Sequence, residues 1–230
     1  MNTQSYQPVA LIIGASRGLG LGLTKRFLER DWQVIATERE GSVRPELRNL
    51  AATDPRLSVE TVDMDSDASL QALRDRLSKR SLDLVMVNAG TLGDPDAPFV
   101  QRLLAVMRTN VAGAMSAVRY FSTQVRAGGV VAVMSSELAS ITDNTKGRWE
   151  PYRSSKSALN QSLRSFAAEM PDALWSLTAV APGWVRTDMG GPDAILDIET
   201  STRGVTNMLM THFNQRGIAF LNYQGKTLNW

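Results

Sequence analysis

The chain contains no cysteine and only one histidine, His212, among its 230 residues. The absence of cysteine excludes disulfide bonds and every mechanism that uses a thiolate. A single histidine cannot build a histidine-rich metal site. A Ser-His-Asp triad could be built only on His212, because the chain has no other histidine. His212 lies in a polar stretch near the end of the chain, where we expect a solvated side chain. We therefore predict no metal site.

Long apolar runs and clustered basic residues are also missing. No apolar run approaches the roughly 18 residues that a helix needs to cross a bilayer, and the polar segment 1–8 lacks the pattern of a signal peptide. These absences predict a cytoplasmic protein with no membrane partner. The formal net charge is +2, with basic residues scattered among acidic ones. This distribution argues against nucleic acid as the partner.

What the chain does contain is a regular alternation of short apolar runs and amphipathic helical stretches. The run Val130–Met134 is almost entirely apolar, with three valines, which is typical of a strand covered on both faces of a parallel sheet. Strict alternation predicts right-handed crossovers and a doubly wound α/β Rossmann fold, with about seven parallel strands and helices on both faces. We see no linker or repeat, so residues 1–230 are expected to form one domain.

The expected strands are Val9–Ile13, Val34–Thr37, Leu57–Val62, Leu82–Val87, Val130–Met134, Trp175–Val180 and Ile218–Asn222. The expected helices are Leu19–Arg30, Glu46–Ala52, Ser69–Lys79, Phe99–Val125, Tyr152–Glu169 and Thr202–Thr211. In such sheets, ligands bind at the carboxyl ends of the strands, where the strand order reverses. The residues that follow each strand are therefore the candidates for a site.

A glycine-rich turn follows the first expected strand and opens a helix. Its glycines are Gly14, Gly18 and Gly20, with Ser16, Arg17 and Leu19 between them. Backbone amides at a helix amino terminus can approach a pyrophosphate closely when no side chain intervenes. The spacing differs from the common Gly-x-Gly-x-x-Gly pattern, but the position after the first strand predicts a dinucleotide site.

The end of the second strand bears on the choice between NADP(H) and NAD(H). Glu38 would accept hydrogen bonds from ribose hydroxyls and favour NAD(H), whereas Arg39 would pair with a 2′-phosphate and favour NADP(H). Arg17 can reach the same phosphate, so we favour NADP(H) and leave NAD(H) open. Asp63 is a candidate acceptor for the adenine amino group beside the Met64 amide, with a turn aspartate as the alternative.

Tyr152 and Lys156 are four residues apart at the start of a helix, so both side chains lie on one face. A free tyrosine titrates near pH 10, too high for efficient acid–base chemistry at neutral pH. A neighbouring ammonium favours the phenolate and would lower that pKa. A pair with this spacing is common on helices, so its meaning depends on what surrounds it.

Other polar or small residues follow the fourth, fifth and sixth strands. After the fifth strand, a serine hydroxyl of Ser135 or Ser136 could hold a substrate oxygen. Asparagine is a poor helix former, and we interpret Asn110 as an amide that holds a water next to Lys156. Asn88-Ala89-Gly90 follows the fourth strand and would place small residues and a polar amide against the cofactor. The sixth strand is followed by Pro182-Gly183-Trp184-Val185-Arg186-Thr187, whose backbone groups and Thr187 hydroxyl could clamp a nicotinamide carboxamide.

Taken in order, these motifs resemble the short-chain dehydrogenase/reductase family over essentially the whole chain. The segments 136–144, 152–160, 182–192 and 222–226 are similar to its branch of C-factor and sniffer-type carbonyl reductases. The resemblance implies hydride transfer between a nicotinamide cofactor and a carbonyl or alcohol. It also implies a soluble homo-oligomer, and the outer faces of Phe99–Val125 and Tyr152–Glu169 are the interface that we expect.

The resemblance implies a role for each matching residue. Tyr152 would be the general acid in reduction, Ser136 would orient the carbonyl, Lys156 would bind the nicotinamide ribose, and Asn110 would anchor a relay water. Ser136 is preferred to Ser135 because the family usually uses the second serine. The gap between Ser136 and Tyr152 is longer than usual. Val87 stands where many members have asparagine, and Glu38 stands where NAD-using members often carry aspartate.

The expected substrate is a small carbonyl or alcohol in an apolar or aromatic opening. Its candidate lining residues are Leu92, Trp149, Trp184, Met189 and Ile195, although the tryptophans could instead pack the loops. A sugar-nucleotide epimerase would share the Tyr-x-x-x-Lys pair, but only about fifty residues follow the sixth strand, fewer than a substrate domain needs. A dinucleotide-binding regulator or signal of C-factor type is the alternative from another class.

Overall fold

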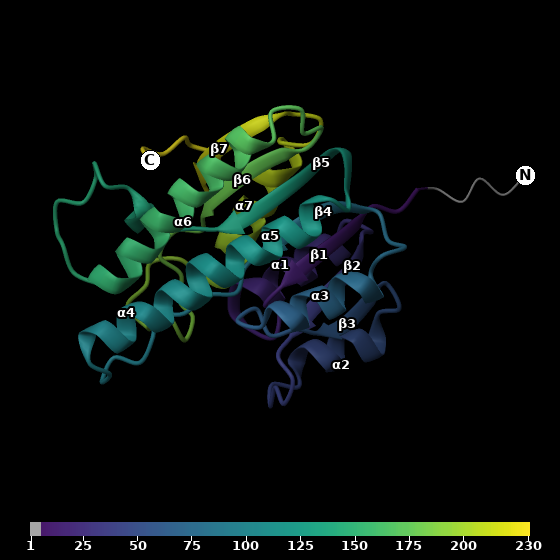
Figure 1. The fold of residues 1–230 in the computed structure, drawn as a ribbon. Helices are drawn as coiled ribbons and strands as arrows, with labels where there is room; N and C mark the ends of the chain where they lie inside the picture. Colours follow the sequence, from purple (N-terminus) through teal and green to yellow (C-terminus); the bar gives the residue numbers. More distant parts are fainter. Residues whose placement is uncertain (1–5) are drawn as a thin grey trace, which may run out of the picture.

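The computed structural model describes residues 6–230. All seven strands in this part of the chain belong to one parallel sheet with the order β3-β2-β1-β4-β5-β6-β7 (Figure 1). The strands are β1 (Val9–Ile13), β2 (Gln33–Glu38), β3 (Leu57–Thr61), β4 (Leu82–Val87), β5 (Val125–Met134), β6 (Ser176–Ala181) and β7 (Gly217–Asn222). The predicted doubly wound Rossmann architecture is confirmed, and the strand order reverses between β1 and β4.

Helices cover both faces of the sheet, and each face has its own apolar core. One core joins the sheet to α3 (Asp67–Arg76), α5 (Ala114–Ser122) and α6 (Glu150–Glu169). The other joins it to α1 (Gly18–Leu28), α2 (Glu46–Thr53) and α7 (Ile198–Met210). Strands β4 and β6 are buried along their whole length, as a strand covered on both faces requires.

The expected single helix Phe99–Val125 is wrong in detail. The structure has α4 (Phe99–Met107), a π-helical turn (Arg108–Gly113) and α5 in its place. Asn110 lies in that turn, where the backbone is wider than in an α-helix, and such turns often occur at functional sites. The apolar periodicity on both sides is helical, so the sequence pattern does not reveal the interruption.

Strand β5 begins at Val125 rather than at the expected Val130. Its pairing with β4 shifts between Leu82 and Leu84, so the strand contains an irregularity before Val130. Gly128, with φ of +80°, supplies the left-handed backbone that this irregularity needs. Residues 126–129 lie between the expected helix and the expected strand, whereas the structure includes them in β5.

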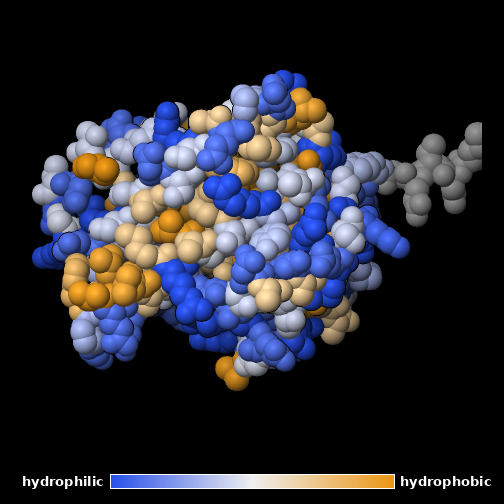
Figure 2. Space-filling model, in the orientation of Figure 1, coloured by the Kyte–Doolittle hydropathy of each residue, from blue (hydrophilic) through white to orange (hydrophobic). Residues whose placement is uncertain are grey.

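Among residues 6–230, no helix is both long enough and apolar enough to span a membrane. Helix α6 places Leu159, Leu163 and Phe166 in the core and exposes polar residues such as Gln161 and Arg164. The exposed face of this helix is therefore mainly polar, and its expected part in an oligomer interface stays a prediction. Helix α4 differs, because Phe99, Val100 and Leu104 are exposed and form an apolar patch (Figure 2).

Candidate active site

The glycine loop between β1 and α1 is shaped for close approach of a ligand to its backbone. Gly14 has φ of +87°, and a Cβ atom there would lie 2.7 Å from the Cβ atom of Ala89. A Cβ atom at Gly20 would lie 2.1 Å from the carbonyl oxygen of Gly14. No side chain caps the amino terminus of α1, so its first amides face the loop without a side-chain acceptor. These features fit a pyrophosphate group, and hence a dinucleotide.

Two side chains outside the loop hold it in this shape. The Asn88 amide donates a 2.7 Å hydrogen bond to the carbonyl oxygen of Gly14. The buried Thr37, in β2, accepts from the Gly14 amide through its hydroxyl and from the Ala15 amide through its carbonyl. Thr37 has no predicted role in the sequence analysis. The only sequence feature that points to this role is the position of Thr37 directly before the charged pair 38–39.

Tyr152 and Lys156 lie one turn apart on α6, as their spacing predicts. The Lys156 Nζ atom is 5.6 Å from the centre of the Tyr152 ring. It donates a 2.8 Å hydrogen bond to the carbonyl oxygen of Met134 at the end of β5. Sheet and helix therefore hold the lysine together, and its amino group is directed toward the carboxyl edge of β5.

We expect Lys156 to lower the pKa of Tyr152, but in the structure the pKa of Tyr152 is raised. Burial raises the pKa of Tyr152 to about 12, while a hydrogen bond with Ser136 acts in the opposite direction. Burial lowers the pKa of Lys156 to about 8. The protein alone therefore keeps Tyr152 as a neutral phenol, because removing the phenolate from water costs more than Ser136 recovers.

The two serines after β5 have separate environments. The Ser135 hydroxyl is buried and donates a 2.7 Å hydrogen bond to Asn160 Oδ1. Ser136 is only partly buried and accepts a hydrogen bond from the Leu138 amide at 3.1 Å, and it lies close enough to the Tyr152 hydroxyl to lower the pKa of that phenol. The structure thus brings the predicted serine, and not its neighbour, to the tyrosine.

Asn110 is fully buried and makes three hydrogen bonds within the protein. Its Nδ2 atom donates to the Thr91 carbonyl at 2.9 Å and to Ser155 Oγ at 3.0 Å, and its Oδ1 atom accepts from the Thr91 amide at 2.8 Å. The π-helical turn is therefore fastened both to the loop after β4 and to α6. Asn110 and Lys156 both approach Gly90, since a Cβ there would lie 3.2 Å from Asn110 Oδ1 and 3.6 Å from Lys156 Nζ. The water-holding role that we expect for Asn110 stays a prediction.

The loop after β6 lies against the glycine loop. The Thr187 hydroxyl accepts from the Gly190 amide at 3.1 Å, which closes a turn. A Cβ at Gly18 would lie 3.6 Å from the Thr187 methyl group, so the two loops are in contact. Val185 bridges to Leu196 in the same loop. The segment 182–187 is therefore next to the predicted cofactor cradle.

The predicted substrate-lining residues come from three loops. Trp149 and Trp184 are each 52% exposed and Met189 is 43% exposed, whereas Leu92 is partly buried. Both tryptophans are half-exposed and lie outside the apolar core, and the predicted role of these residues in lining a substrate opening stays a prediction. Trp149 precedes α6 with a left-handed backbone, and Trp184 donates from its indole to the Gly190 carbonyl.

The charged residues predicted to contact the adenosine half of the cofactor differ in exposure. The Glu38 side chain is fully buried; its Oε1 atom accepts from Arg48 at 2.5 Å, and its Oε2 atom has no hydrogen-bond partner among the described residues. The contact that we expect between Glu38 and the cofactor ribose stays a prediction. Arg39 is exposed. Asp63 is exposed, and its Oδ1 atom accepts from the Asp65 amide, as in the alternative of a turn aspartate; the neighbouring Met64 is buried.

Two further charged residues had no role in the sequence analysis. Asp188, in the loop after β6, pairs with both Arg17 and Arg44. Arg44 stands in no recognisable motif, whereas Asp188 lies in the segment 182–192 that resembles the carbonyl reductases but has no role of its own in that resemblance.

Comparison with known proteins identifies relatives over most of the chain. The short chain dehydrogenase family model matches residues 8–194. A solved protein from Burkholderia multivorans, assigned as a short-chain dehydrogenase/reductase and bound to NADP, is 40% identical. The match covers 98% of this chain and 100% of that one, with a TM-score of 0.94.

Two other relatives correspond to the predicted branch of the family. A carbonyl reductase from Pseudomonas aeruginosa PAO1, solved with NADP, is 34% identical. It covers 98% of this chain and 100% of its own, with a TM-score of 0.88. The C-signal of Myxococcus xanthus is 30% identical over 169 residues, which is 70% of this chain and 100% of that protein. The predicted resemblance is confirmed.

Proposed function

The chain belongs to the short-chain dehydrogenase family and is an NAD(P)-dependent oxidoreductase, and on that premise we propose that it is an NADP(H)-dependent carbonyl reductase acting as one domain over residues 1–230. The observation that carries the proposal is the juxtaposition of three side chains at the end of β5: Ser136 lies beside Tyr152 and lowers the pKa of its phenol, and Lys156 lies one helical turn from Tyr152. The B. multivorans and P. aeruginosa relatives, both solved with NADP, support this cofactor.

In the proposed reaction, a carbonyl carbon gains a hydride and its oxygen gains a proton. The reduced nicotinamide supplies the hydride when it is bound. Tyr152 donates the proton from its hydroxyl, since a phenol with a pKa of about 12 is protonated at neutral pH. Ser136 donates a hydrogen bond to the same carbonyl oxygen and keeps it beside Tyr152. The products are the alcohol, the oxidised cofactor and the Tyr152 phenolate, which regains a proton from water before the next turnover.

The residues around this pair would hold the cofactor and maintain the geometry. The glycine loop, with Asn88 and Ala89 beside it, would hold the pyrophosphate. Lys156 would bind the nicotinamide ribose, and its buried amino group is oriented by the Met134 carbonyl. The backbone of segment 182–187 would contact the nicotinamide, and Asn110 would keep the loop after β4 in place beside α6.

We further propose a cytoplasmic homo-oligomer that uses the α4 patch of Phe99, Val100 and Leu104 as part of its interface. Exposed apolar side chains gathered on one helix favour burial against another surface. Light scattering that shows only monomer at micromolar concentration would contradict this proposal.

The test of the proposed activity is a screen of ketones, aldehydes and quinones with NADPH and NADH in parallel. Turnover of at least one class with NADPH supports the proposal. Tight cofactor binding without turnover of any carbonyl would contradict it and would instead favour the regulatory or signalling alternative.

A further inference from the structure

Three charged side chains from three separate loops meet beside the glycine loop. Asp188, after β6, accepts hydrogen bonds on its Oδ2 atom from both Arg17 and Arg44. The distance from Arg44 Nη2 to that oxygen is 2.9 Å. The side chains of Arg17, Arg44 and Asp188 are 55%, 45% and 59% exposed, so a dissolved anion can reach them.

Two guanidinium groups directed at one oxygen form a binding site for an anion. Each guanidinium has five N–H donors, so the single hydrogen bond that each makes to Asp188 leaves donors free. A phosphate monoester carries nearly two negative charges and three acceptor oxygens, and it therefore matches two arginines better than one carboxylate does. In dinucleotide-binding folds, the loop after β2 is where the 2′-phosphate of NADP(H) is recognised, and Arg44 belongs to that loop.

Glu38 does not disturb this arrangement, although it ends β2. Its carboxylate is buried, and the pair with Arg48 compensates its charge. The acidic side chain that faces the two arginines is instead Asp188, which is 144 residues from Arg44 in the chain.

We infer that Asp188 is a specificity-determining residue that competes with the 2′-phosphate of NADP(H) for Arg17 and Arg44. The inference rests on the NADP(H) preference in the proposed function. The Asp188 carboxylate offsets part of the positive charge of the two guanidinium groups and repels the phosphate, which lowers the affinity for the phosphate. NADH carries no such phosphate, so the competition narrows the difference in affinity between the two cofactors.

The experiment measures binding of two probes, 2′,5′-ADP and 5′-AMP, to the full chain by isothermal titration calorimetry. Asp188→Asn removes the charge and keeps the shape, and it should tighten 2′,5′-ADP about three- to tenfold while leaving 5′-AMP unchanged. Arg44→Gln should weaken 2′,5′-ADP about tenfold or more. In the double variant, Asp188→Asn should tighten 2′,5′-ADP binding much less than it does alone, because one of the two arginines for which Asp188 competes is absent.

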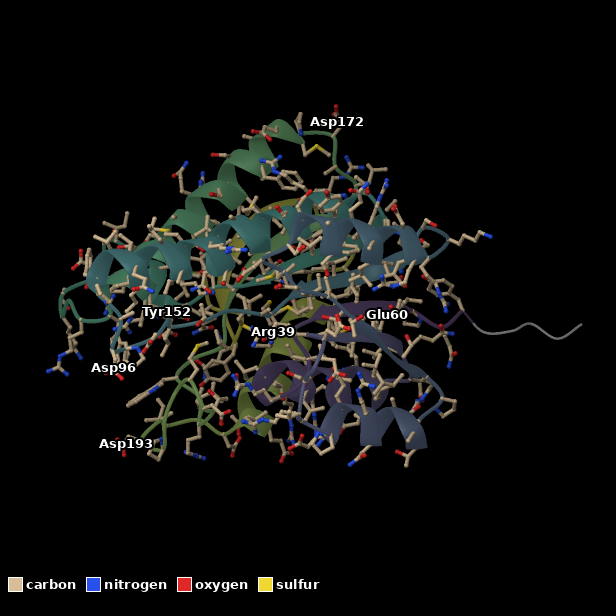
Figure 3. The ribbon with its side chains drawn as sticks, turned by 60° about the horizontal axis from the view of Figure 1, so that its bottom comes forward. Arg39, Glu60, Asp96, Tyr152, Asp172 and Asp193 are labelled. Atoms are coloured by element: carbon tan, nitrogen blue, oxygen red, sulfur yellow. The ribbon has the colours of Figure 1, made fainter. Side chains whose placement is uncertain are left out.

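The matched control is Asp193→Asn in the same loop (Figure 3). Asp193 is exposed and takes part in no ion pair within residues 6–230, so this variant changes the net charge equally without touching the arginines. It should alter 2′,5′-ADP binding by less than about twofold. Thermal melting of each variant verifies that the fold is retained.

Each outcome separates this inference from the proposed function. If Asp188→Asn leaves 2′,5′-ADP binding unchanged or weakens it, or if Asp193→Asn has the same effect, the inference is overturned. If neither the wild-type protein nor Asp188→Asn distinguishes the two probes, both the inference and the NADP(H) preference are overturned. If the variants behave as expected but no carbonyl is reduced, the proposed activity fails and the inference stands.

Discussion

The two sides of the site are held by different kinds of interaction. On the nucleotide side, defined by Arg17, Arg44 and Asp188, half-exposed side chains pair through charge. On the reaction side, defined by Asn110, Ser136, Tyr152 and Lys156, partly or fully buried side chains bond to the backbone and to one another. Exposed ion pairs contribute about 0–1 kcal/mol each and weaken in salt. A buried polar group left without its partner costs about 1–3 kcal/mol.

Buried hydrogen bonds suit proton transfer on the reaction side, and exposed ion pairs suit cofactor recognition on the nucleotide side. Proton transfer needs hydroxyl groups held in one geometry, and buried hydrogen bonds provide it. Recognition of a charged cofactor needs a field that an anion in water can reach. We therefore expect substitutions on the reaction side to change turnover or stability, and substitutions on the nucleotide side to change cofactor affinity in a salt-dependent way.

The largest expected effect is that of Tyr152→Phe, which keeps the ring and removes only the hydroxyl. Turnover should fall by about 10²–10⁴-fold because the proton donor is lost, whereas folding and NADPH affinity should persist. Steady-state kinetics beside cofactor titration measures both. Near-normal turnover in this variant would refute the proposed mechanism.

The second prediction concerns Lys156, whose pKa is lowered to about 8 by burial. Above pH 8, folded protein releases this proton while unfolded protein, with a lysine pKa near 10.4, still holds it. The free energy of unfolding should therefore rise with pH between about 8 and 10, by up to about 1.4 kcal/mol per pH unit. Urea denaturation at pH 7.5 and 9.5 measures the rise.

The matched variant for this measurement is Lys156→Met, which removes the amine and keeps most of the length of the side chain. The rise should be smaller in this variant by the contribution of Lys156. Equal pH dependence in both proteins would show that the lysine is not titrating in this window.

The third prediction compares the adjacent serines. Ser135→Ala should lower the free energy of unfolding by about 1–3 kcal/mol, because the buried Asn160 Oδ1 atom loses its donor. Ser136→Ala should chiefly lower kcat, with little change in cofactor binding. Urea denaturation and kinetics on both variants give the comparison, and a stronger loss of kcat in Ser135→Ala would reverse the assignment.

The smallest expected effect is on the nucleotide side. Arg39 is exposed, so Arg39→Ala should weaken NADPH by about tenfold or less and leave NADH unchanged. Fluorescence titration at low salt and at 0.5 M salt measures this, and the difference between variant and wild type should shrink as screening increases. Equal weakening of NADH would mean that Arg39 does not contact the phosphate.

Much of the site could be predicted because its motifs are local. Tyr152 and Lys156 share a face through helical spacing alone, and the glycine loop follows the first strand directly. Asn110 was recognised as unusual inside a helix, but its hydrogen bonds to Thr91 and Ser155 depend on where α6 packs. Glu38 was predicted to face the ribose, and only the packing of α2 shows Arg48 covering it.

Local sequence patterns predict the succession of strands and helices along the chain, the doubly wound sheet and the gathering of motifs at the carboxyl ends of the strands. These features follow from residue periodicity and from chain direction, both of which are set by neighbouring residues. Which charged side chains meet depends instead on the folded arrangement of the loops. Arg17 and Asp188 are 171 residues apart, and no local pattern connects them. A side chain finds its partner only after the loops are placed by the sheet, because the pairing depends on distances of a few ångströms in three dimensions.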